Sequence, residues 1–297
     1  MSKVCIVIVN YNGAKYQNDC IRTLYQMTYT DFDIVIIDSG SHDNSIELVK
    51  KEFPEVIVLE QKDNVGVAAG NNIGIKYGID NGAEYTLLLN NDTEVDKQML
   101  ERLIENADER TITVPKIYYY EPSNVLWYAG GDFVFEKGTV NHVGCDEIDK
   151  GQYNKKKYVE YSPTCCMLIK NTVFEDVGLI DEIVFMYCDD TDFCVRLFDK
   201  DYKILYVPDS IVWHKVSSSS GGNKSKLGIY YMYRNQLYFM KKHKNHISKK
   251  TYYSLLLKNT AKGILSPFRK NKNEKYILTA YKDYYTGKMG RKDFDDR

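Results

Sequence analysis

Short apolar runs alternate with longer amphipathic segments through the first third of the chain. Four runs rich in branched aliphatic residues occupy positions 4–9, 34–37, 56–59 and 86–89. Nearly continuous hydrophobicity of this kind predicts strands that are covered on both faces. Between the runs, apolar residues recur at helical spacing, first behind a capping cluster at 43–45 and then across 67–81. Strands that alternate with helices predict a parallel sheet with right-handed crossovers, and therefore an α/β domain.

The pattern changes twice after the fourth run. From about residue 111 it loosens into aromatic and Gly-rich sequence with short strand-like pieces, which predicts mixed sheet and long loops. Beyond residue 228, Tyr- and Lys-rich sequence of helical character continues to the end. We therefore expect a domain at 1–227, with halves at 1–110 and 111–227, and a helical C-terminal appendage at 228–297. The Ser-Gly run at 217–222 predicts a mobile loop.

Composition places the chain among ordinary folded proteins, with 43% hydrophobic and 27% charged residues. The 40 Lys and Arg residues nearly balance 41 Asp and Glu residues, so no overall field attracts nucleic acid and we expect no such partner. Seven cysteines without a C-x-x-C pair indicate reduced thiols rather than disulfides or zinc. We find no signal peptide and no run near the roughly 20 apolar residues of a membrane span. We expect a cytoplasmic protein that lies on a membrane if it meets one.

Polar residues follow three of the predicted strands at the point where each strand ends. They are Asn10-Tyr11-Asn12-Gly13, Asp38-Ser39-Gly40-Ser41 and Asn90-Asn91-Asp92. In an open parallel sheet, ligands bind beyond the carboxyl ends of the strands. A carboxylate there can accept a hydrogen bond from a nucleotide or hold a metal ion that carries a diphosphate. Asp38 and Asp92 could equally cap the following helices, so this pattern leaves both interpretations open.

Seven ordered motifs make the chain recognisable. They are VIVNYN at 7–12, IIDSGS at 36–41, NVGVAAGNN at 64–72, LLNND at 88–92, FMYCDDTDFCVR at 185–196, VPD at 207–209 with Trp213-His214, and YRN at 233–235. Together they resemble the family 2 glycosyltransferases, specifically their rhamnosyltransferase-like branch, over roughly residues 3–240. The resemblance implies a GT-A fold, which is a Rossmann-like mixed sheet flanked by helices. It also implies inverting transfer of a sugar from a nucleotide diphosphate donor to an acceptor hydroxyl.

The resemblance places the donor site at the strand ends. Asn90-Asn91-Asp92 stands where the family has its DxD motif, whose carboxylates hold a divalent ion, but only the last carboxylate is present. His214 matches a family histidine near the metal, so we expect Asp92 and His214 as ligands and Mn or Mg as the ion. Four other histidines lack such a context and are expected at the surface: His42, His142, His243 and His246. The residues expected near the nucleotide are Asn10, Asn12, Asp38, Asn64, Asn71 and Asn91.

The cluster Asp189-Asp190-Thr191-Asp192 has the composition for base catalysis. Crowded carboxylates raise one another's pKa, so one can be held as a proton acceptor, although a solvated acidic turn has the same composition. The resemblance implies a catalytic ED pair, with Asp189 in place of the commoner Glu and Asp190 as the general base. Arg234 could contact the diphosphate or pack along a Tyr-rich helix. The serine-rich loop at 217–222 could close over the donor.

The C-terminal basic stretches leave two interpretations open, a solvated helix face or docking on an anionic membrane leaflet. Members of this branch commonly build bacterial surface polysaccharides on lipid-linked acceptors. The resemblance therefore implies a saccharide or polyprenyl-diphosphate-linked acceptor and a possible peripheral membrane contact. Rhamnose from dTDP-rhamnose and hexoses from UDP donors both remain open as the transferred sugar.

Two other functions compete with this one. A sugar nucleotidyltransferase shares the sheet type, but it needs a basic Gly-rich loop near the first strand, and Asn10-Tyr11-Asn12-Gly13 is not one. A catalytically inactive carbohydrate-binding protein of the same fold is conceivable because Asn90 replaces the first DxD carboxylate. Release of nucleoside diphosphate from a sugar nucleotide would separate these possibilities.

Overall fold

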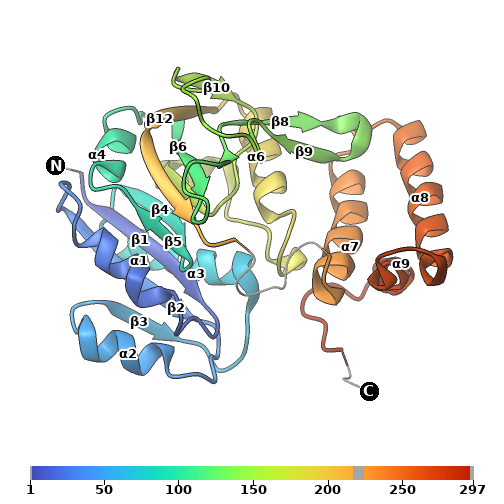
Figure 1. Ribbon diagram of the computed structural model, residues 1–297, viewed down its shortest axis with the longest axis horizontal. Helices are drawn as coiled ribbons and strands as arrows, with labels where there is room; N and C mark the ends of the chain where they lie inside the picture. Colours follow the sequence, from blue (N-terminus) through green and yellow to red (C-terminus); the bar gives the residue numbers. More distant parts are fainter. Residues whose placement is uncertain (1, 217–223, 295–297) are drawn as a thin grey trace.

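The computed structural model describes residues 2–216 and 224–294, so the predicted serine-rich loop at 217–222 lies outside the described residues. A mixed sheet with helices on its faces forms most of the molecule, and three further helices stand at one end (Figure 1). The predicted α/β class, with a helical C-terminal region, is confirmed. The boundary at residue 227 stays a prediction, because helix α7 (Lys226–Lys242) shares a hydrophobic core with Phe185 and Val195 of the preceding part.

The first half of the chain has the predicted parallel sheet. Strands β1 (Val4–Asn10), β2 (Phe32–Asp38), β3 (Ile57–Glu60) and β4 (Tyr85–Asn90) lie in the order β4-β1-β2-β3, and every pair is parallel. Their carboxyl ends therefore meet at one edge of the sheet. The helices between and after them are α1 (Gln17–Leu24), α2 (Ser45–Glu52), α3 (Gly66–Asp80) and α4 (Met99–Ile104).

Helix α3 lies unusually close to the central strand because glycines line its inner face. A Cβ atom added to Gly74 would meet Val7 Cγ1 at 2.2 Å, and one added to Gly70 would meet Val9 at 2.8 Å. The four-residue spacing places these glycines on one side of the helix. The glycines of the NVGVAAGNN motif and its continuation thus let the helix backbone approach β1.

The second half extends the sheet in the order β10-β12-β6-β11-β4, in which β12 and β6 are parallel and the other neighbouring pairs are antiparallel. Short β5 (Thr93–Val95) follows β4 directly and pairs with the end of β12 (Lys203–His214), with Thr93 opposite His214. This pairing brings two segments more than 100 residues apart to the same edge. The other strands are β6 (Thr111–Tyr119), β7 (Leu126–Tyr128), β8 (Gly131–Val134), β9 (Thr139–His142), β10 (Lys157–Val159) and β11 (Cys166–Lys170).

The remaining helices carry the chain from the sheet to the far end of the molecule. Helix α6 (Asp189–Asp199) lies against the sheet, and α7 (Lys226–Lys242), α8 (Lys249–Ile264) and α9 (Tyr276–Tyr285) form the C-terminal group (Figure 1). No helix among residues 2–216 and 224–294 is both long and apolar enough to cross a membrane. The short elements are α5 (Thr172–Val177), η1 (Phe135–Lys137), η2 (Glu182–Val184), η3 (Ser266–Phe268) and η4 (Lys272–Lys275).

Candidate active site

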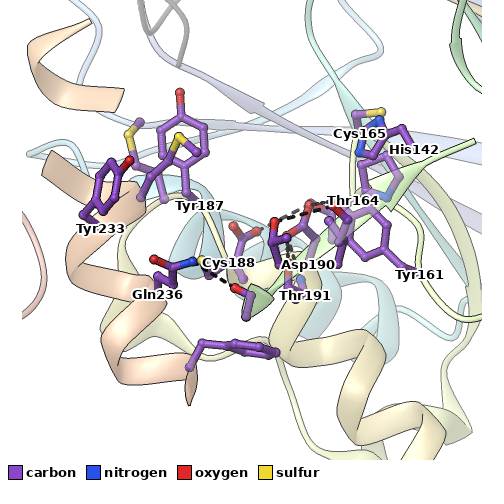
Figure 2. Close-up of a pocket in the computed structure, with 18 of the residues that line it drawn as sticks. His142, Tyr161, Thr164, Cys165, Tyr187, Cys188, Asp190, Thr191, Tyr233 and Gln236 are labelled. Carbon is purple, nitrogen blue, oxygen red and sulfur yellow. Dashed lines mark hydrogen bonds between the residues drawn. The ribbon is translucent and has the colours of Figure 1, made fainter. Parts of the chain in front are cut away.

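A cavity of about 700 Å³ lies between the edge of the sheet, the β8–β9 hairpin and helices α7 and α8 (Figure 2). All four residues predicted to act in catalysis or to bind the metal line it: Asp92, His214, Asp189 and Asp190. They come from β4–β5, β12 and α6, so three separate parts of the chain converge on one space. The cavity is thus the place where the predicted metal pair and the predicted base occur together.

Asp92 and His214 meet because β5 pairs with the end of β12. Asp92 Oδ1 lies 3.1 Å from His214 Nε2, and both residues are buried. His214 Nδ1 is also buried and has no hydrogen-bond partner within the described part of the chain. The Trp127 and His214 rings pack nearly perpendicular to each other, with centroids 4.7 Å apart. The Asp92 carboxylate suits Mn or Mg, and Mn also accepts an imidazole nitrogen such as that of His214.

The pair alone does not make a complete metal cage. Over residues 2–216 and 224–294, no three or more His, Cys, Asp or Glu side chains gather as a metal-binding group. Asn90 also lines the cavity, and its amide oxygen is a neutral ligand where the DxD motif has a carboxylate. An ion held at this pair would therefore need oxygens from the donor diphosphate to complete its coordination.

The two acidic residues of α6 differ in their surroundings. Asp190 is half-buried and accepts a hydrogen bond from the Tyr161 hydroxyl at 2.6 Å, while the Thr191 backbone N–H donates to its other oxygen at 2.6 Å. Asp189 is buried, and the Thr164 hydroxyl is 3.5 Å from its carboxyl group. Burial and the neighbouring charge of Asp190 raise the pKa of Asp189 well above its usual range. Asp190 is thus the carboxylate that an acceptor can reach.

The turn before α6 is held in an unusual conformation. Phe185, Tyr187 and Cys188 all have φ between 62° and 66°, which side chains of this size rarely adopt. Asn235 of α7 fixes this turn, because its buried side-chain amide donates to the backbone carbonyls of Met186 at 2.8 Å and Tyr187 at 3.1 Å, as well as to that of Val184. A helix of the C-terminal group therefore shapes the approach to the base.

Arg234, the candidate diphosphate contact, has a different role. Its side chain is fully buried, and its guanidinium donates to the carbonyls of Val184 and Gly290 and to the side chain of Asn235. It lines no part of the cavity. The diphosphate prediction for Arg234 is wrong, because the guanidinium is used within the fold. The alternative of packing along the Tyr-rich helix is correct, since the ring of Tyr231 lies 4.9 Å from it.

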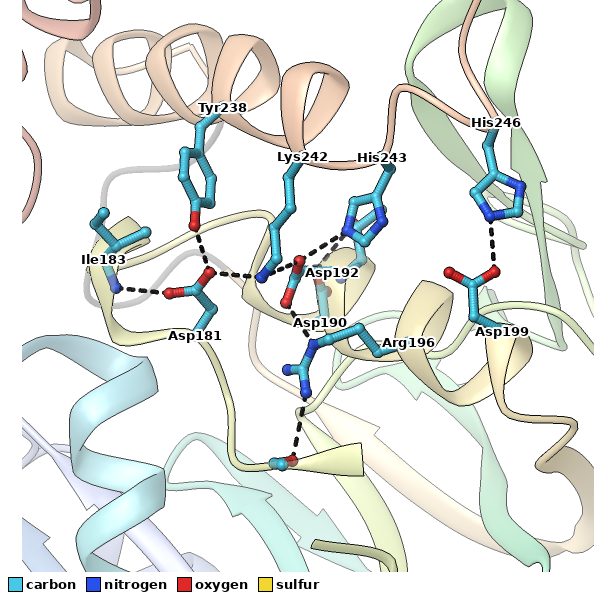
Figure 3. A network of polar contacts seen from close by, with 12 residues as sticks. Asp181, Ile183, Asp190, Asp192, Arg196, Asp199, Tyr238, Lys242, His243 and His246 are labelled. Atoms are coloured by element: carbon cyan, nitrogen blue, oxygen red, sulfur yellow. Dashed lines mark hydrogen bonds and ion pairs between the residues drawn. The ribbon is translucent and has the colours of Figure 1, made fainter. Parts of the chain in front are cut away.

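A second polar cluster ties α7 to α6 (Figure 3). Asp192 is buried and accepts from His243 Nε2 at 2.8 Å and Arg196 Nε at 2.9 Å, and it forms an ion pair with Lys242 at 2.7 Å. Burial alone would raise the pKa of Asp192, but the hydrogen bond from His243 and the charges of Arg196 and Lys242 outweigh it and hold the pKa at about 2. The surface position predicted for His243 is wrong, because the imidazole is enclosed by this cluster.

His142 also departs from the expected surface position. It lines the cavity, and its ring lies at the edge of Trp127 and near Tyr161. Burial lowers the pKa of His142. Nothing in the sequence around it marks it, because its placement depends on the β8–β9 hairpin folding over the sheet. His42 is exposed as expected, and His246 is partly buried against Asp199.

None of the six predicted nucleotide residues lines the cavity described above, and four of them, Asn10, Asn12, Asp38 and Asn91, lie at the ends of β1, β2 and β4. Asn10 is fully buried and donates to Asp38 Oδ1 at 3.1 Å, and Asn91 donates to Asn10 Oδ1 at 2.8 Å. Asn12 accepts from the backbone of His42. These side chains hold one another, so their nucleotide contacts stay a prediction. The nucleotide contacts of two residues near the start of α3 also stay a prediction. Asn64 accepts a hydrogen bond from the Gly66 N–H, and Asn71 is buried.

Comparison with known proteins shows which family of enzymes this chain resembles. The family described as "Glycosyl transferase family 2" matches residues 5–178. The chain is similar to "Glycosyltransferase GlyG" of Streptococcus pneumoniae, with 26% identity over 73% of this chain and 72% of that protein. It is also similar to "dTDP-rhamnosyl transferase RfbF" of Shigella flexneri, with 24% identity over 83% of this chain and 82% of that protein.

A solved structure shares the fold. The mannosyltransferase PcManGT from Pyrobaculum calidifontis, in complex with GDP-Man and Mn²⁺, has a TM-score of 0.60 and 12% sequence identity. The match covers 97% of this chain and 88% of that one. At this identity the likeness concerns the fold, and it confirms the expected GT-A type. The family match extends over more than half of the 297 residues. The chain therefore belongs to glycosyl transferase family 2, and it is a glycosyltransferase that uses a nucleotide-sugar donor.

Proposed function

We propose that this protein is an inverting glycosyltransferase of bacterial surface polysaccharide synthesis. It transfers the sugar of dTDP-rhamnose or a UDP-hexose to a hydroxyl group of a saccharide or polyprenyl-diphosphate-linked acceptor. One observation carries the proposal: Asp92 and His214 line the same cavity as Asp190, so leaving group and acceptor can be handled in a single space. The Shigella flexneri relative is a dTDP-rhamnosyl transferase, which supports a dTDP-sugar donor.

Asp190 acts as the general base in this proposal. The acceptor hydroxyl gives its proton to the Asp190 carboxylate while its oxygen forms a bond to the anomeric carbon of the donor. The bond from that carbon to the diphosphate breaks on the opposite side, and the electron pair leaves with the nucleoside diphosphate. A single displacement of this kind inverts the anomeric centre. The Tyr161 hydroxyl orients Asp190, and its own pKa is raised by burial, so it stays a donor.

Asp92 and His214 act on the leaving group. They would hold Mn or Mg, with Asn90 and the donor phosphates completing the shell. When bound, such an ion neutralises the charge that develops on the diphosphate. The Mn²⁺ in the PcManGT complex supports this choice of ion. Trp127 packs on the imidazole and keeps its orientation fixed. We place the reaction in the cytoplasm or at the inner face of the cytoplasmic membrane.

A thermal-shift screen tests the donor. Because a ligand that binds only the folded state raises the melting temperature, dTDP, UDP, GDP and their sugars are compared with and without Mn²⁺. We expect a metal-dependent increase with one base. No shift with any nucleotide would favour the inactive carbohydrate-binding protein, which the missing carboxylate at Asn90 makes conceivable. A sugar nucleotidyltransferase would instead release pyrophosphate from a nucleoside triphosphate and a sugar phosphate.

Product stereochemistry tests the mechanism. Once a donor is identified, the anomeric configuration of the new glycosidic bond is read by NMR and compared with that of the donor. We expect inversion. Retention would mean a double displacement or a front-side reaction, and Asp190 could not then act as the base of a single displacement.

A further inference from the structure

Helix α8 is attached to the molecule by one face only. Leu255 and Leu256 pack against the core that it shares with α7 and α9, and Asn259 and Gly263 are buried. A Cβ atom added to Gly263 would meet the Leu278 side chain of α9 at 2.9 Å, so the two helices lie in close contact. The inner face of α8 is therefore fully used by the fold.

The outer face of α8 is apolar and exposed. Tyr253, Leu257 and Ile264 have 60%, 72% and 61% of their surface exposed, and Phe268 just beyond the helix has 88%. Ala261 lies between them and is exposed as well. The spacing of Tyr253, Leu257, Ala261 and Ile264 by four, four and three residues places them along one side of α8, and Phe268 follows in η3. We call these five residues the outer stripe. A continuous exposed apolar stripe is typical of an interaction surface.

The charge around the outer stripe indicates the kind of partner. The sequence contains no Asp or Glu between Asp209 and Glu274. The same segment carries basic side chains near both ends of the stripe: Lys249 and Lys250 near its start, and Lys270, Lys272 and Arg269, which also pairs with Glu274, near its end. An apolar face flanked by Lys and Arg, without acidic residues, complements an anionic lipid surface. Figure 1 shows α8 at the end of the molecule far from β2 and β3, where no other described element covers that side.

We propose that the outer stripe docks this protein on an anionic lipid leaflet, with the flanking lysines at the headgroup phosphates. The opposite side of α8 contributes Leu255, Lys258 and Lys262 to the wall of the active-site cavity. Docking would therefore hold that cavity roughly one helix diameter, about 10 Å, from the lipid surface. If docking serves to give the cavity access to a lipid-linked acceptor, that purpose rests on the proposed function. The docking does not rest on the proposed function.

Co-sedimentation with vesicles tests the docking. Full-length protein is mixed at low salt with vesicles of phosphatidylcholine alone or of phosphatidylcholine with phosphatidylglycerol. We expect binding to the anionic vesicles that weakens as salt is added. The double variant Leu257→Ser with Phe268→Ser should lower the partition coefficient by roughly tenfold or more, because both side chains lose their apolar contact. Lys250→Gln with Lys270→Gln should weaken binding to anionic vesicles only.

A matched control keeps the test specific. Tyr158→Ser changes an equally exposed apolar side chain, 65% exposed, on the distant strand β10 and should bind as the wild type does. The proposal is overturned if the wild type ignores anionic vesicles, or if the Leu257 and Phe268 variant still binds normally. It is also overturned if the wild type is a dimer that this variant converts to a monomer, because the stripe would then be the interface of a second copy.

The two proposals fail separately. Hydrolysis of a sugar nucleotide in the absence of acceptor uses the cavity and not the outer stripe, so the Leu257 and Phe268 variant should hydrolyse donor at the wild-type rate. Vesicle binding without any donor hydrolysis would remove the transferase function and leave the docking surface. Donor hydrolysis without vesicle binding would remove the docking surface and leave the transferase function.

Discussion

Asp190 owes its proposed role to its neighbours. Tyr161 and Thr191 each donate to one of its oxygens and so fix the carboxylate, while the buried Asp189 has a raised pKa beside it. Burial and the charge of Asp190 favour the neutral form of Asp189. Asp190 is the member of the pair that an acceptor can reach, so it is the one that can take the acceptor proton.

Replacing the Asp190 carboxylate should stop turnover without preventing donor binding. We expect Asp190→Asn to lower kcat by roughly 10²- to 10⁴-fold, because the amide cannot take the acceptor proton. The dissociation constant of the donor should stay near the wild-type value in calorimetry. Asp199→Asn, at the other end of the same helix, serves as the control. Near-normal turnover of the Asp190 variant would refute its assignment as base.

The metal pair gives a second prediction at this scale. Excess EDTA should abolish activity, and added Mn²⁺ should restore it. His214→Ala should raise the dissociation constant of Mn²⁺, measured by electron paramagnetic resonance with nucleoside diphosphate present, by roughly tenfold. His42→Ala removes an exposed imidazole and should leave the dissociation constant of Mn²⁺ unchanged. Full activity in excess EDTA would contradict the metal site.

Residues differ in how far the sequence could identify them. Asp92, His214, Asp189 and Asp190 stand within motifs, and they meet in one cavity as a shared site requires. Tyr161 belongs to none of the sequence motifs, and it contacts Asp190 only because the segment before β11 folds against α6. Contacts that depend on long-range packing leave no local pattern in the chain, so such residues were missed.

At the scale of elements, α7 positions the helix that carries the base. Asn235 donates to three carbonyls of the turn at 184–187, and Gly66 at the start of α3 leaves room for the Phe185 carbonyl, which would lie 2.5 Å from an added Cβ. The motif YRN therefore acts through backbone geometry. The sequence indicated that this motif mattered, but only the packing of α7 on the turn shows how.

Disturbing this turn should affect catalysis more than binding. We expect Asn235→Ala to lower kcat by up to roughly 100-fold, because small displacements of a base are costly, while the KM for the donor changes little. Asn235→Asp keeps the size of the side chain but loses the two N–H donors, and it should be equally impaired. Lys241→Ala, exposed on the same helix, should behave as the wild type. Normal kcat in Asn235→Asp would show that the hydrogen bonds do not position the base.

The cluster around Asp192 predicts how the docking of α7 on α6 depends on pH. The folded protein lowers the pKa of Asp192 from 3.8 to about 2, so the ionised form stabilises the fold by about 2 kcal/mol above pH 4. This contribution is lost as the pH falls from about 4 towards 2. Urea unfolding of wild type and Asp192→Asn should therefore differ by about that amount at pH 7 and converge on acidification. A difference that is constant with pH would contradict the lowered pKa.

At the scale of the whole molecule, strand pairing was predictable in the parallel half of the sheet, whereas in the other half only the presence of mixed sheet was. Strands β1 to β4 are continuous apolar runs separated by helices, and their pairing follows from rules for α/β folds. The pairing of β5 with β12 joins short segments far apart in sequence, and no periodicity encodes it. That unpredictable pairing is what brings His214 to Asp92.

The C-terminal helices contribute to the candidate active site together with the sheet and α6. They share a core with Phe185 and Val195, supply Asn235 to the turn before the base, and form one wall of the cavity. A division of the chain into a catalytic domain and a dispensable appendage would miss these contacts. The position of α8 at the edge of the molecule also gives the cavity its proposed relation to a lipid surface (Figure 1).

The most direct measurement is the release of nucleoside diphosphate from dTDP-rhamnose and UDP-hexoses with Mn²⁺ and no acceptor, for the wild type and for Asp92→Asn. If the cavity is the donor site of a transferase, the wild type releases nucleoside diphosphate from at least one donor and Asp92→Asn releases almost none. Absence of release from every donor by the wild type, or undiminished release by Asp92→Asn, would contradict that assignment.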